Sequence, residues 1–465
     1  MKNKIYNIGF FIMAMAIVSS CNYEEQFDPN NPSTSLIANN ASKATLQGVV
    51  TGLEARHRVY YTNATQMFGS FGREVWAFFG SDPRFIGDWL GIGGTTYPDF
   101  FASNGTYLSP YQAVLQSNTL IEAVKPENNS NLTLQESAGY AGFAKTIKGY
   151  QLIFPWLQQW DNGIRIDVSE PLNPGPILSR AEAQTAIRVI LDEGYNDLLG
   201  SEFAFTLTTG WDGFETPAGM VQVNRAITAR FAVYSGDYSG ALTALGNSFL
   251  DLNDARSAAA MMVGPMHVYG EAPDVNNPLF YPLDASTSTI LVIHPSVVED
   301  NIAAYDTTAS GVFNDLRARN KFYKRNEPVI NQTIGAEFPG EYQDLRWPSN
   351  TDPIPFIRNE ELILLYAEAH WFAGTRSESI RALNNVRNTW AVGDTPITAG
   401  SLTDEFVEEL LLQRRFSLWA EGGHRWIDLR RLNKLDAAHI DLREGGSIFT
   451  QIDRRVSEQT WEDSN

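Results

Sequence analysis

The chain has only one cysteine in 465 residues, so it can form neither an internal disulfide nor a zinc site built from cysteines. Basic residues are also scarce, since 35 Lys and Arg stand against 54 Asp and Glu, for a formal net charge of -19. Affinity for nucleic acid rests on basic side chains that displace counterions from phosphates. This balance excludes DNA, RNA and simple adsorption to anionic lipid as partners.

Motifs of catalysis are missing as well. No two of the six histidines are spaced four residues apart, so a His-Glu-x-x-His zinc site is absent. The chain also lacks a Gly-x-Ser-x-Gly elbow, a phosphate-binding Gly-x-x-x-x-Gly-Lys-Ser/Thr loop and a Gly-x-Gly-x-x-Gly fingerprint. We therefore expect a protein that is not an enzyme and uses no metal or cofactor. The 54 acidic residues leave a carboxylate pair of a glycoside hydrolase open as an alternative.

The lone cysteine, Cys21, follows a segment typical of a targeting signal. Lys2 and Lys4 precede an apolar run of 11 residues, 8–18, and two serines stand directly before the cysteine. The run is shorter than the ~20 residues that span a bilayer. The pattern resembles a bacterial lipoprotein signal, which predicts a signal peptide over residues 1–20 and acyl chains on Cys21. Several acyl chains, at ~0.8 kcal/mol per buried methylene, anchor a protein stably. A free cysteine behind an ordinary signal peptide is the alternative.

Residues 21–40 predict a tether, because they are rich in Asn, Pro and Ser and show no apolar periodicity. Acidic residues at Glu24, Glu25 and Asp28 resemble the surface-export signal of some outer-membrane lipoproteins, although a solvated linker has the same composition. We expect a protein that is anchored in the outer membrane by lipid and faces the cell exterior. Residues 41–465 are expected to form a single domain.

Most of that domain has the apolar spacing of helices. Apolar residues recur at three- and four-residue steps from Leu46 to Phe68, and Ser109 with Pro110 predicts the start of the next helix. Capping boxes are predicted at three further starts: Thr133 with Glu136, Ser179 with Glu182, and Thr375 with Glu378. Antiparallel pairs are predicted for 226–234 with 240–250 and for 359–372 with 376–390, followed by a helix over 403–420. About eight helices in neighbouring pairs resemble a tetratricopeptide array, which predicts a mainly α fold.

Two regions interrupt this pattern. Residues 80–107 form a long glycine-rich connection, and residues 251–358 hold 10 of the chain's 22 prolines with only short β-like runs. Both carry several aromatic residues. Aromatic side chains on loops suit sugar binding, because a pyranose ring stacks its apolar face on an indole or phenol while its hydroxyls bond to polar side chains. The alternative is that these aromatics anchor the loops to the core.

Three motifs follow in the C-terminal third. They are Arg358-x-x-Glu361-Leu362-x-Leu364-x-Tyr366-Ala367-Glu368-Ala369, then Ala382-Leu383-Asn384-x-Val386-Arg387, then Gly423-His424-Arg425-Trp426-x-Asp428-Leu429-Arg430-Arg431. In this order, behind a lipoprotein signal, they resemble the SusD/RagB family of outer-membrane nutrient-binding lipoproteins. Read physically, the motif residues are structural, with ion pairs where helices meet. The residues in question are Arg358, Glu361, Glu368, Asn384, Arg387, Arg425 and Asp428.

The resemblance implies a tetratricopeptide-like core with loops over one face, and a SusC-like TonB-dependent transporter as partner. In such pairs the lipoprotein captures an oligosaccharide, or in some members a peptide, and delivers it to the transporter. By position, the family places its stacking aromatics in the two loop regions. The predicted ligand-binding residues are Trp89, Tyr97 and Trp347, with Asp88, Asp99, Asp344 and Arg346 as polar neighbours. A peptide ligand, a surface glycosidase and a purely structural scaffold are the alternatives to glycan binding.

Overall fold

The fold is seen in a computed structural model that describes residues 37, 39–80, 82, 84–92, 104–170, 173–252, 257–454, 458 and 460. Cys21 and most of the predicted tether lie outside these residues. Within the described part, no helix has both the length and the apolar character needed to cross a bilayer. In the same part of the chain, no group of three or more His, Cys, Asp or Glu side chains is arranged to hold a metal ion.

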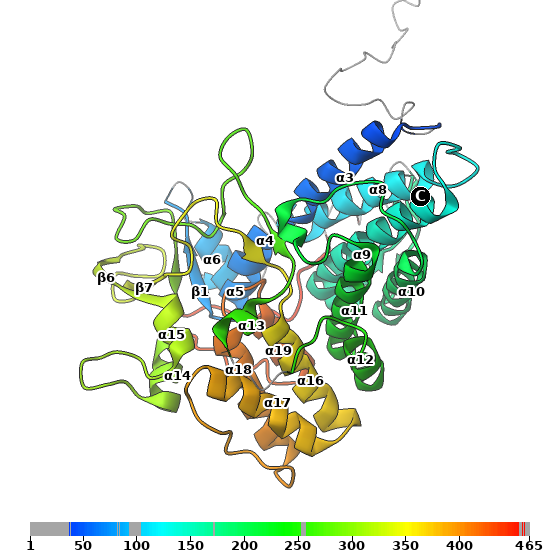
Figure 1. The fold of residues 1–465 in the computed structure, drawn as a ribbon. Coiled ribbons are helices and arrows are strands. Elements are labelled where there is room, and N and C mark those ends of the chain that lie inside the picture. Colours follow the sequence, from blue (N-terminus) through cyan, green and yellow to red (C-terminus); the bar gives the residue numbers. More distant parts are fainter. Residues whose placement is uncertain are drawn as a thin grey trace, which may run out of the picture.

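Most helices form an array in which each packs against the next one along the chain (Figure 1). A long insertion separates α12 from α16, yet these two helices also pack together. The prediction of a mainly α, tetratricopeptide-like fold is confirmed. The array comprises α3 (Lys43–His57), α8 (Ser109–Ala123), α9 (Leu134–Gln159), α10 (Arg180–Leu198), α11 (Pro217–Tyr234), α12 (Tyr238–Leu245), α16 (Asn359–Ala373), α17 (Arg376–Thr389), α18 (Thr403–Ser417) and α19 (His424–Arg431).

Local sequence signals explain two of the helix starts. Thr133 accepts the backbone N–H of Glu136 and Ser179 accepts that of Glu182, while each glutamate bonds back to the capping residue. Each reciprocal pair satisfies backbone N–H groups that a helix start leaves open. These two predicted capping boxes are confirmed, and they orient α9 and α10, which pack side by side.

Two other predicted helix starts differ from the prediction. The side chain of Thr375 makes no capping bond: the backbone N–H of Glu378 donates to the carbonyl of Thr375, and the carboxylate of Glu378 is held by Arg381. Ser109 is the first helical residue of α8, and Leu108 precedes it as the cap. Which residue caps a helix depends on the neighbouring groups in the folded protein, and a local sequence pattern does not include them.

The first helical stretch is broken, although its apolar spacing predicts one face through to Phe68. After α3 the chain forms α4 (Tyr60–Asn63), a fully buried π-helical turn η1 (Ala64–Phe68) and α5 (Gly69–Phe71). A later segment presses on this turn: Gly422 donates its N–H to the hydroxyl of Thr65. Gly423 has φ 82°, and a Cβ there would lie 2.2 Å from the Cβ of Phe68. Only glycine fits, so the break and the C-terminal motif belong to one packing arrangement.

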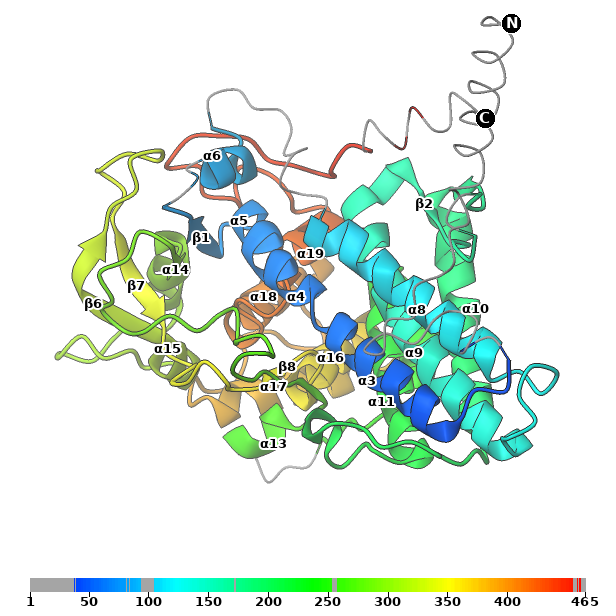
Figure 2. The same ribbon diagram turned by 90° about the horizontal axis from the view of Figure 1, so that it is seen from above.

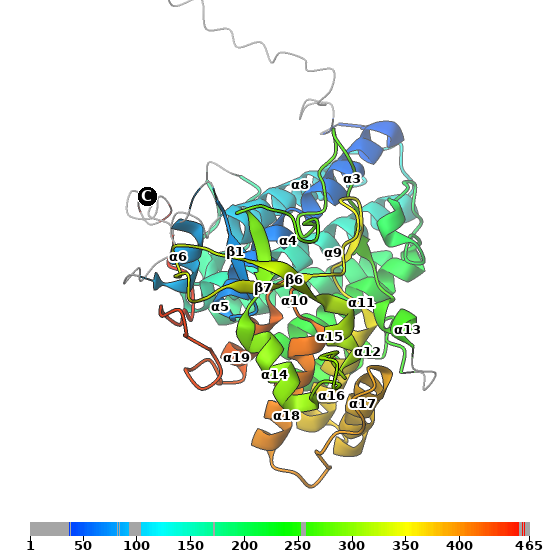
Figure 3. The same ribbon diagram turned by 90° about the vertical axis from the view of Figure 1, so that its left-hand side faces the viewer.

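A four-stranded antiparallel sheet stands beside the helical array (Figures 2 and 3). Its order is β1-β5-β7-β6, so the first strand, which the sequence did not predict, pairs with strands of the insertion. Val75 of β1 lies opposite Ile293 of β5, and Val292 of β5 lies opposite Gln343 of β7. The strands are β1 (Val75–Phe78), β5 (Ile290–Ile293), β6 (Phe322–Val329) and β7 (Gly340–Asp344).

The two regions predicted as loops hold more regular structure than expected. The first contains α6 (Arg84–Leu90) and a π turn η3 (Asn104–Leu108) around residues outside the description. The insertion adds α13 (Ala258–Met262), α14 (Pro295–Tyr305), α15 (Leu316–Lys321) and a small pair of strands, β4 (Met266–His267) with β8 (Ile354–Pro355). Elsewhere lie β2 (Ile164–Arg165) with β3 (Ile177–Leu178) and the 3-10 turns η4 (Trp160–Asn162) and η5 (Thr209–Trp211).

One large cluster of buried side chains joins these parts. It runs from Ile37 near the start of the described residues to Ile452 near their end, and includes rings from both the helices and the insertion. A second cluster fills the space among α16, α17 and α18. A core shared in this way favours the predicted single domain over 41–465, which stays a prediction. It also means that the loops are held in place by the helical array.

Candidate functional site

Trp347 lies in the segment that leaves β7 and leads to β8. Its indole N–H donates to the Oδ2 of Asp344 at 3.0 Å, and Arg346 binds the same carboxylate through Nε and Nη2. The Trp347 side chain is half-buried and packs on the edge of the core. Its ring is therefore held in one orientation before any ligand arrives, which lowers the entropic cost of stacking.

Arg346 ties this tryptophan to the body of the protein. Its guanidinium carbon lies 5.1 Å from the ring centre of Trp347 and 5.0 Å from that of Trp419. Nη1 donates to the Oε1 of Glu421 at 3.2 Å. Burial acts to lower the pKa of Arg346, but the carboxylates of Asp344 and Glu421 hold it above its ordinary value. The Trp347 segment is thus fixed by charge-assisted hydrogen bonds to the C-terminal part.

Glu421 is the centre of a larger charged network. Arg358 donates Nε to its Oε2 at 2.8 Å, and Lys321 lies 3.6 Å from its Oε1. Burial favours the neutral acid, yet Arg358 and Lys321 bring the pKa of Glu421 down to about 2. Burial lowers the pKa of Lys321 to about 8, which Glu421 partly opposes. This network joins α15, the start of α16 and the loop after α18. Glu421 is linked to the Trp347 segment through its ion pair with Arg346.

The family-motif residues lie in contacts between elements, and all but Asn384 are buried. Arg358 pairs with Glu360 and Glu421, Glu361 with Arg230, Glu368 with Arg431, Arg387 with Glu409, and Asp428 with Arg414 and Arg431. The side chain of Asn384 accepts the N–H of Thr395, and Arg425 donates to the carbonyl of His439. Buried pairs of this kind specify geometry more than they add stability.

The other predicted ligand-binding residues differ in how accessible they are. Trp89 is completely buried on α6, edge-on to Phe79 and Phe85, so its ring has no free face for a sugar. Its prediction as an accessible platform is corrected by this burial: the segment that carries it is a packed helix and not an open loop. Asp88 is half-exposed on the same helix, and burial raises its pKa. Tyr97 and Asp99 lie outside the described residues.

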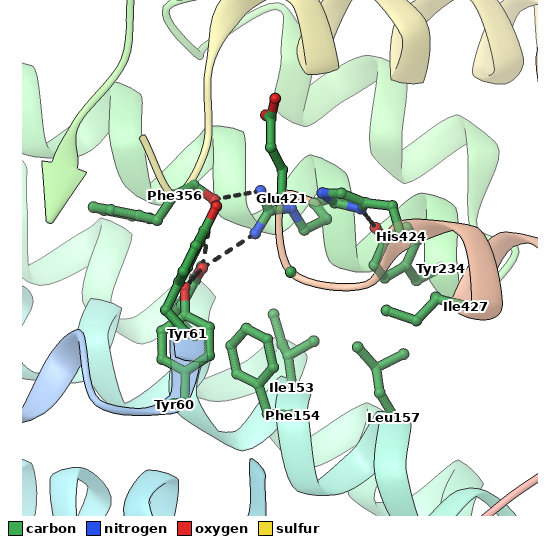
Figure 4. A pocket seen from close by; sticks show the side chains of 13 residues that line it. Tyr60, Tyr61, Ile153, Phe154, Leu157, Tyr234, Phe356, Glu421, His424 and Ile427 are labelled. Carbon is green, nitrogen blue, oxygen red and sulfur yellow. Dashed lines mark hydrogen bonds between the residues drawn. The ribbon is translucent and has the colours of Figure 1, made fainter. Parts of the chain in front are cut away.

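An internal cavity lies behind the Glu421 loop (Figure 4). Its volume of about 20 Å³ holds about one water molecule. Arg230 donates to the carbonyl of Phe356 at 2.6 Å and to the hydroxyl of Tyr150 at 3.4 Å, and Tyr60 bonds to Tyr150. A cavity of this size is too small to hold a sugar ring.

A larger pocket of about 230 Å³ opens between the last turns of α3, the η5 turn and the segment after β4. Its charged groups come from Glu54, Arg58 and Asp274, and Trp211 forms part of its wall. Two histidines and two threonines also line it: His57, His267, Thr51 and Thr208. Sequence reasoning missed this site, because its residues are up to 223 positions apart, from 51 to 274. The one local signal was the spacing of Glu54 and Arg58, which puts both charges on one face of α3.

Comparison with known proteins agrees with this architecture. Residues 340–464 match the SusD family model. Among solved structures, NanU of B. fragilis is 14% identical, with 94% of this chain and 98% of that chain covered and a TM-score of 0.65. A laminarin-binding SusD-like protein is 15% identical, with 89% and 96% covered and a TM-score of 0.59. Surface glycan-binding protein A from Bacteroides fluxus is 13% identical, with 86% and 94% covered and a TM-score of 0.57. Among curated proteins, none matches the chain.

These likenesses cover nearly the whole chain at low identity, so they show a common fold. The family match lies over the segment that carries Trp347, Arg358, Glu361 and the helices that follow. The resemblance to the SusD/RagB family, read from the C-terminal motifs, is thereby confirmed.

Proposed function

We propose that this protein is a non-catalytic, cell-surface glycan-binding lipoprotein that passes oligosaccharide to a SusC-like TonB-dependent transporter in the outer membrane. The SusD-type fold and the family match over 340–464 support the proposal. So do the descriptions of similar structures as laminarin-binding and surface glycan-binding proteins. In this proposal residues 1–20 are removed, Cys21 carries the lipid, and residues 21–40 let the domain move above the membrane.

The fixed orientation of Trp347 is the single observation that best supports glycan binding. A ring whose N–H is already satisfied by Asp344 presents its apolar face without a further cost in side-chain entropy. Asp344 is buried and its carboxylate is held by Arg346 and Trp347, so it positions the ring, and Arg346, whose side chain is 13% exposed, is the polar group beside the ring that a sugar hydroxyl could reach. Tyr97, Asp99 and Asp88 remain proposed contacts from the first loop region.

Removing the Trp347 ring is expected to weaken glycan binding about 30-fold, or ~2 kcal/mol, because truncating a central aromatic anchor costs this much in an interface. The change is Trp347→Ala, and the measurement is calorimetric titration with an oligosaccharide found by screening the wild-type protein. Trp347→Phe keeps a ring but loses the bond to Asp344, so its affinity is expected to lie between those of the wild type and Trp347→Ala.

Phe372→Ala is the matched control. Phe372 is an exposed ring near the C-terminal end of α16, whereas the Trp347 segment leads into the N-terminal end of that helix. The control is expected to bind like the wild type. Equal affinities for Trp347→Ala and the wild type, in proteins with cooperative unfolding, would refute the assignment of Trp347.

The alternatives make different predictions. A peptide-binding member of the family would bind oligopeptides and ignore oligosaccharides in the same titration. A surface glycosidase would release reducing ends from a bound polysaccharide, and a scaffold would bind the transporter without affinity for either ligand. The half-buried tryptophan beside Arg346 favours the glycan, because sugars combine stacking on a ring with hydrogen bonds to polar side chains.

A further inference from the structure

The pocket beside α3 is built around polar atoms that the protein leaves without partners. His57 is 1% exposed, and its Nδ1 accepts a bond from Nε2 of Gln151 at 2.7 Å. Burial lowers the pKa of His57 to about 3, so the ring is neutral and carries its proton on Nε2. That Nε2 has no partner among the described residues. A buried donor without a partner costs free energy unless a ligand or water accepts its bond.

Two other side chains that line the pocket, Glu54 and Arg58, each also carry a buried polar atom without a partner anywhere within the described ranges. One oxygen of Glu54 accepts the N–H and the hydroxyl of Thr208 at 2.9 and 2.7 Å. Burial raises the pKa of Glu54, while the bonds from Thr208 and Trp211 and the charge of Arg58 oppose the shift. Arg58 binds both oxygens of Asp274 and the carbonyl of Val268, and its Nε has no partner in the described part of the chain.

Charge and size limit the class of ligand. The charges of Arg58 and Asp274 cancel as a pair, which leaves Glu54 as the unbalanced charge of the pocket. An anionic ligand would be repelled by Glu54, and among the remaining ligands the proposed glycan-binding function favours a neutral sugar. The volume of about 230 Å³ is below the ~300–1,000 Å³ of pockets for drug-sized ligands, so one small ring fits.

We infer that this pocket binds a single neutral pyranose unit, with hydroxyl groups bonded to Glu54, His57 and Arg58 and the ring beside Trp211. The site is separate from Trp347, and the inference rests on the proposed glycan-binding function. Such a pocket would recognise the terminal sugar of a glycan, while the open surface at Trp347 stacks against another part of it. It would exclude chains that end in a uronic acid.

Two substitutions on one helix test the pocket. Ala55 is exposed and lines the pocket, so Ala55→Trp is expected to fill it without disturbing the core. Ala44→Trp is the matched control, since Ala44 is exposed on α3 about three turns earlier and does not line the pocket. Both variants add the same side chain to the same helix.

The probes are methyl glycosides of glucose, galactose and mannose and the methyl glycoside of glucuronic acid, observed by saturation-transfer difference NMR. At least one neutral glycoside is expected to bind the wild type and Ala44→Trp alike, and to bind Ala55→Trp at least about fivefold more weakly. The glucuronide is expected to bind the wild type more weakly than the neutral probes. Glu54→Gln, which removes the charge and keeps an acceptor for Thr208, is expected to narrow that difference.

Several outcomes would overturn the inference. They are the absence of binding by every neutral glycoside, equal binding to Ala55→Trp and Ala44→Trp, or a glucuronide that binds as well as the neutral probes. If oligosaccharide binding depends on Trp347 but no methyl glycoside binds, the proposed function stands and the pocket assignment falls. If methyl glycosides bind in the pocket and Trp347→Ala has no effect on oligosaccharide, the pocket stands and the Trp347 assignment falls.

Discussion

Glu361→Gln is expected to lower the free energy of unfolding by about 3–5 kcal/mol, because it leaves a buried arginine without its counterion. Arg230 donates Nε to Oε1 of Glu361 at 2.6 Å and Nη2 to Oε2 at 2.5 Å, and their side chains are 6% and 2% exposed. Chemical denaturation monitored by tryptophan fluorescence measures the change.

The Arg230–Glu361 pair also connects α11 to the start of α16. Arg230 lies on α11 and Glu361 in the first turn of α16, and Arg230 also donates to the carbonyl of Phe356, just after β8. We therefore expect Glu361→Gln to loosen the segment between β7 and α16, which carries Trp347. Hydrogen exchange of residues 345–357 would report this loosening.

A double substitution and an exposed pair serve as controls. Arg230→Met with Glu361→Leu removes both charges, and is expected to recover much of the loss. Glu378→Gln breaks the pair with Arg381, whose side chains are 36% and 42% exposed, and is expected to cost less than about 1 kcal/mol. A loss from Glu361→Gln no larger than that from Glu378→Gln would contradict the structural reading of the motif.

Mild acid is expected to destabilise the protein because several histidines are buried in the neutral form. Burial lowers the pKa of His424 from 6.5 to about 4 and that of His57 to about 3, and it also lowers the pKa values of His267 and His294. Between the unfolded and folded pKa values the unfolded chain binds protons that the native state does not. Stability is therefore present above pH 6.5 and lost as the pH falls through this window.

The size of the effect follows from the same values. A histidine whose pKa falls from 6.5 to about 4 removes ~2 kcal/mol by pH 5, since one pKa unit corresponds to ~1.4 kcal/mol. Glu54 and Glu74 act in the opposite direction, because burial raises their pKa values. The net expectation is a loss of several kcal/mol between pH 7 and pH 5, seen as a lower denaturation midpoint.

Two histidine variants test the cause. His424 bonds through Nδ1 to the hydroxyl of Tyr234 at 2.5 Å, and His424→Asn keeps a polar atom near that place without a titrating ring. The variant is expected to lose less stability than the wild type between pH 7 and pH 5. His294→Asn, at a second buried histidine whose pKa burial lowers, is expected to act in the same direction. Identical slopes for the wild type and His424→Asn would remove His424 from the explanation.

Local patterns in the sequence predicted much of the helical array. Thr133 and Ser179 begin helices as their capping boxes indicate, and the pairs α11 with α12 and α16 with α17 lie where the turn residues predict them. Caps and apolar periodicity act within a few residues, so they can be recognised without knowing the rest of the fold. The break at Ala64–Phe68 was missed, and the segment that packs against it, at Gly423, is more than 350 residues away.

The sequence by itself determined the acidic balance, the pairing of the helices and the C-terminal motifs by which the chain resembles its family. Tertiary structure alone decided which aromatics are accessible, since it buries Trp89 under Phe79 and Phe85 and leaves Trp347 half-exposed beside Asp344. It also brought Glu54, Trp211 and Asp274 around one pocket. The physical reason is that accessibility and the meeting of side chains depend on long-range packing, whereas periodicity and capping do not.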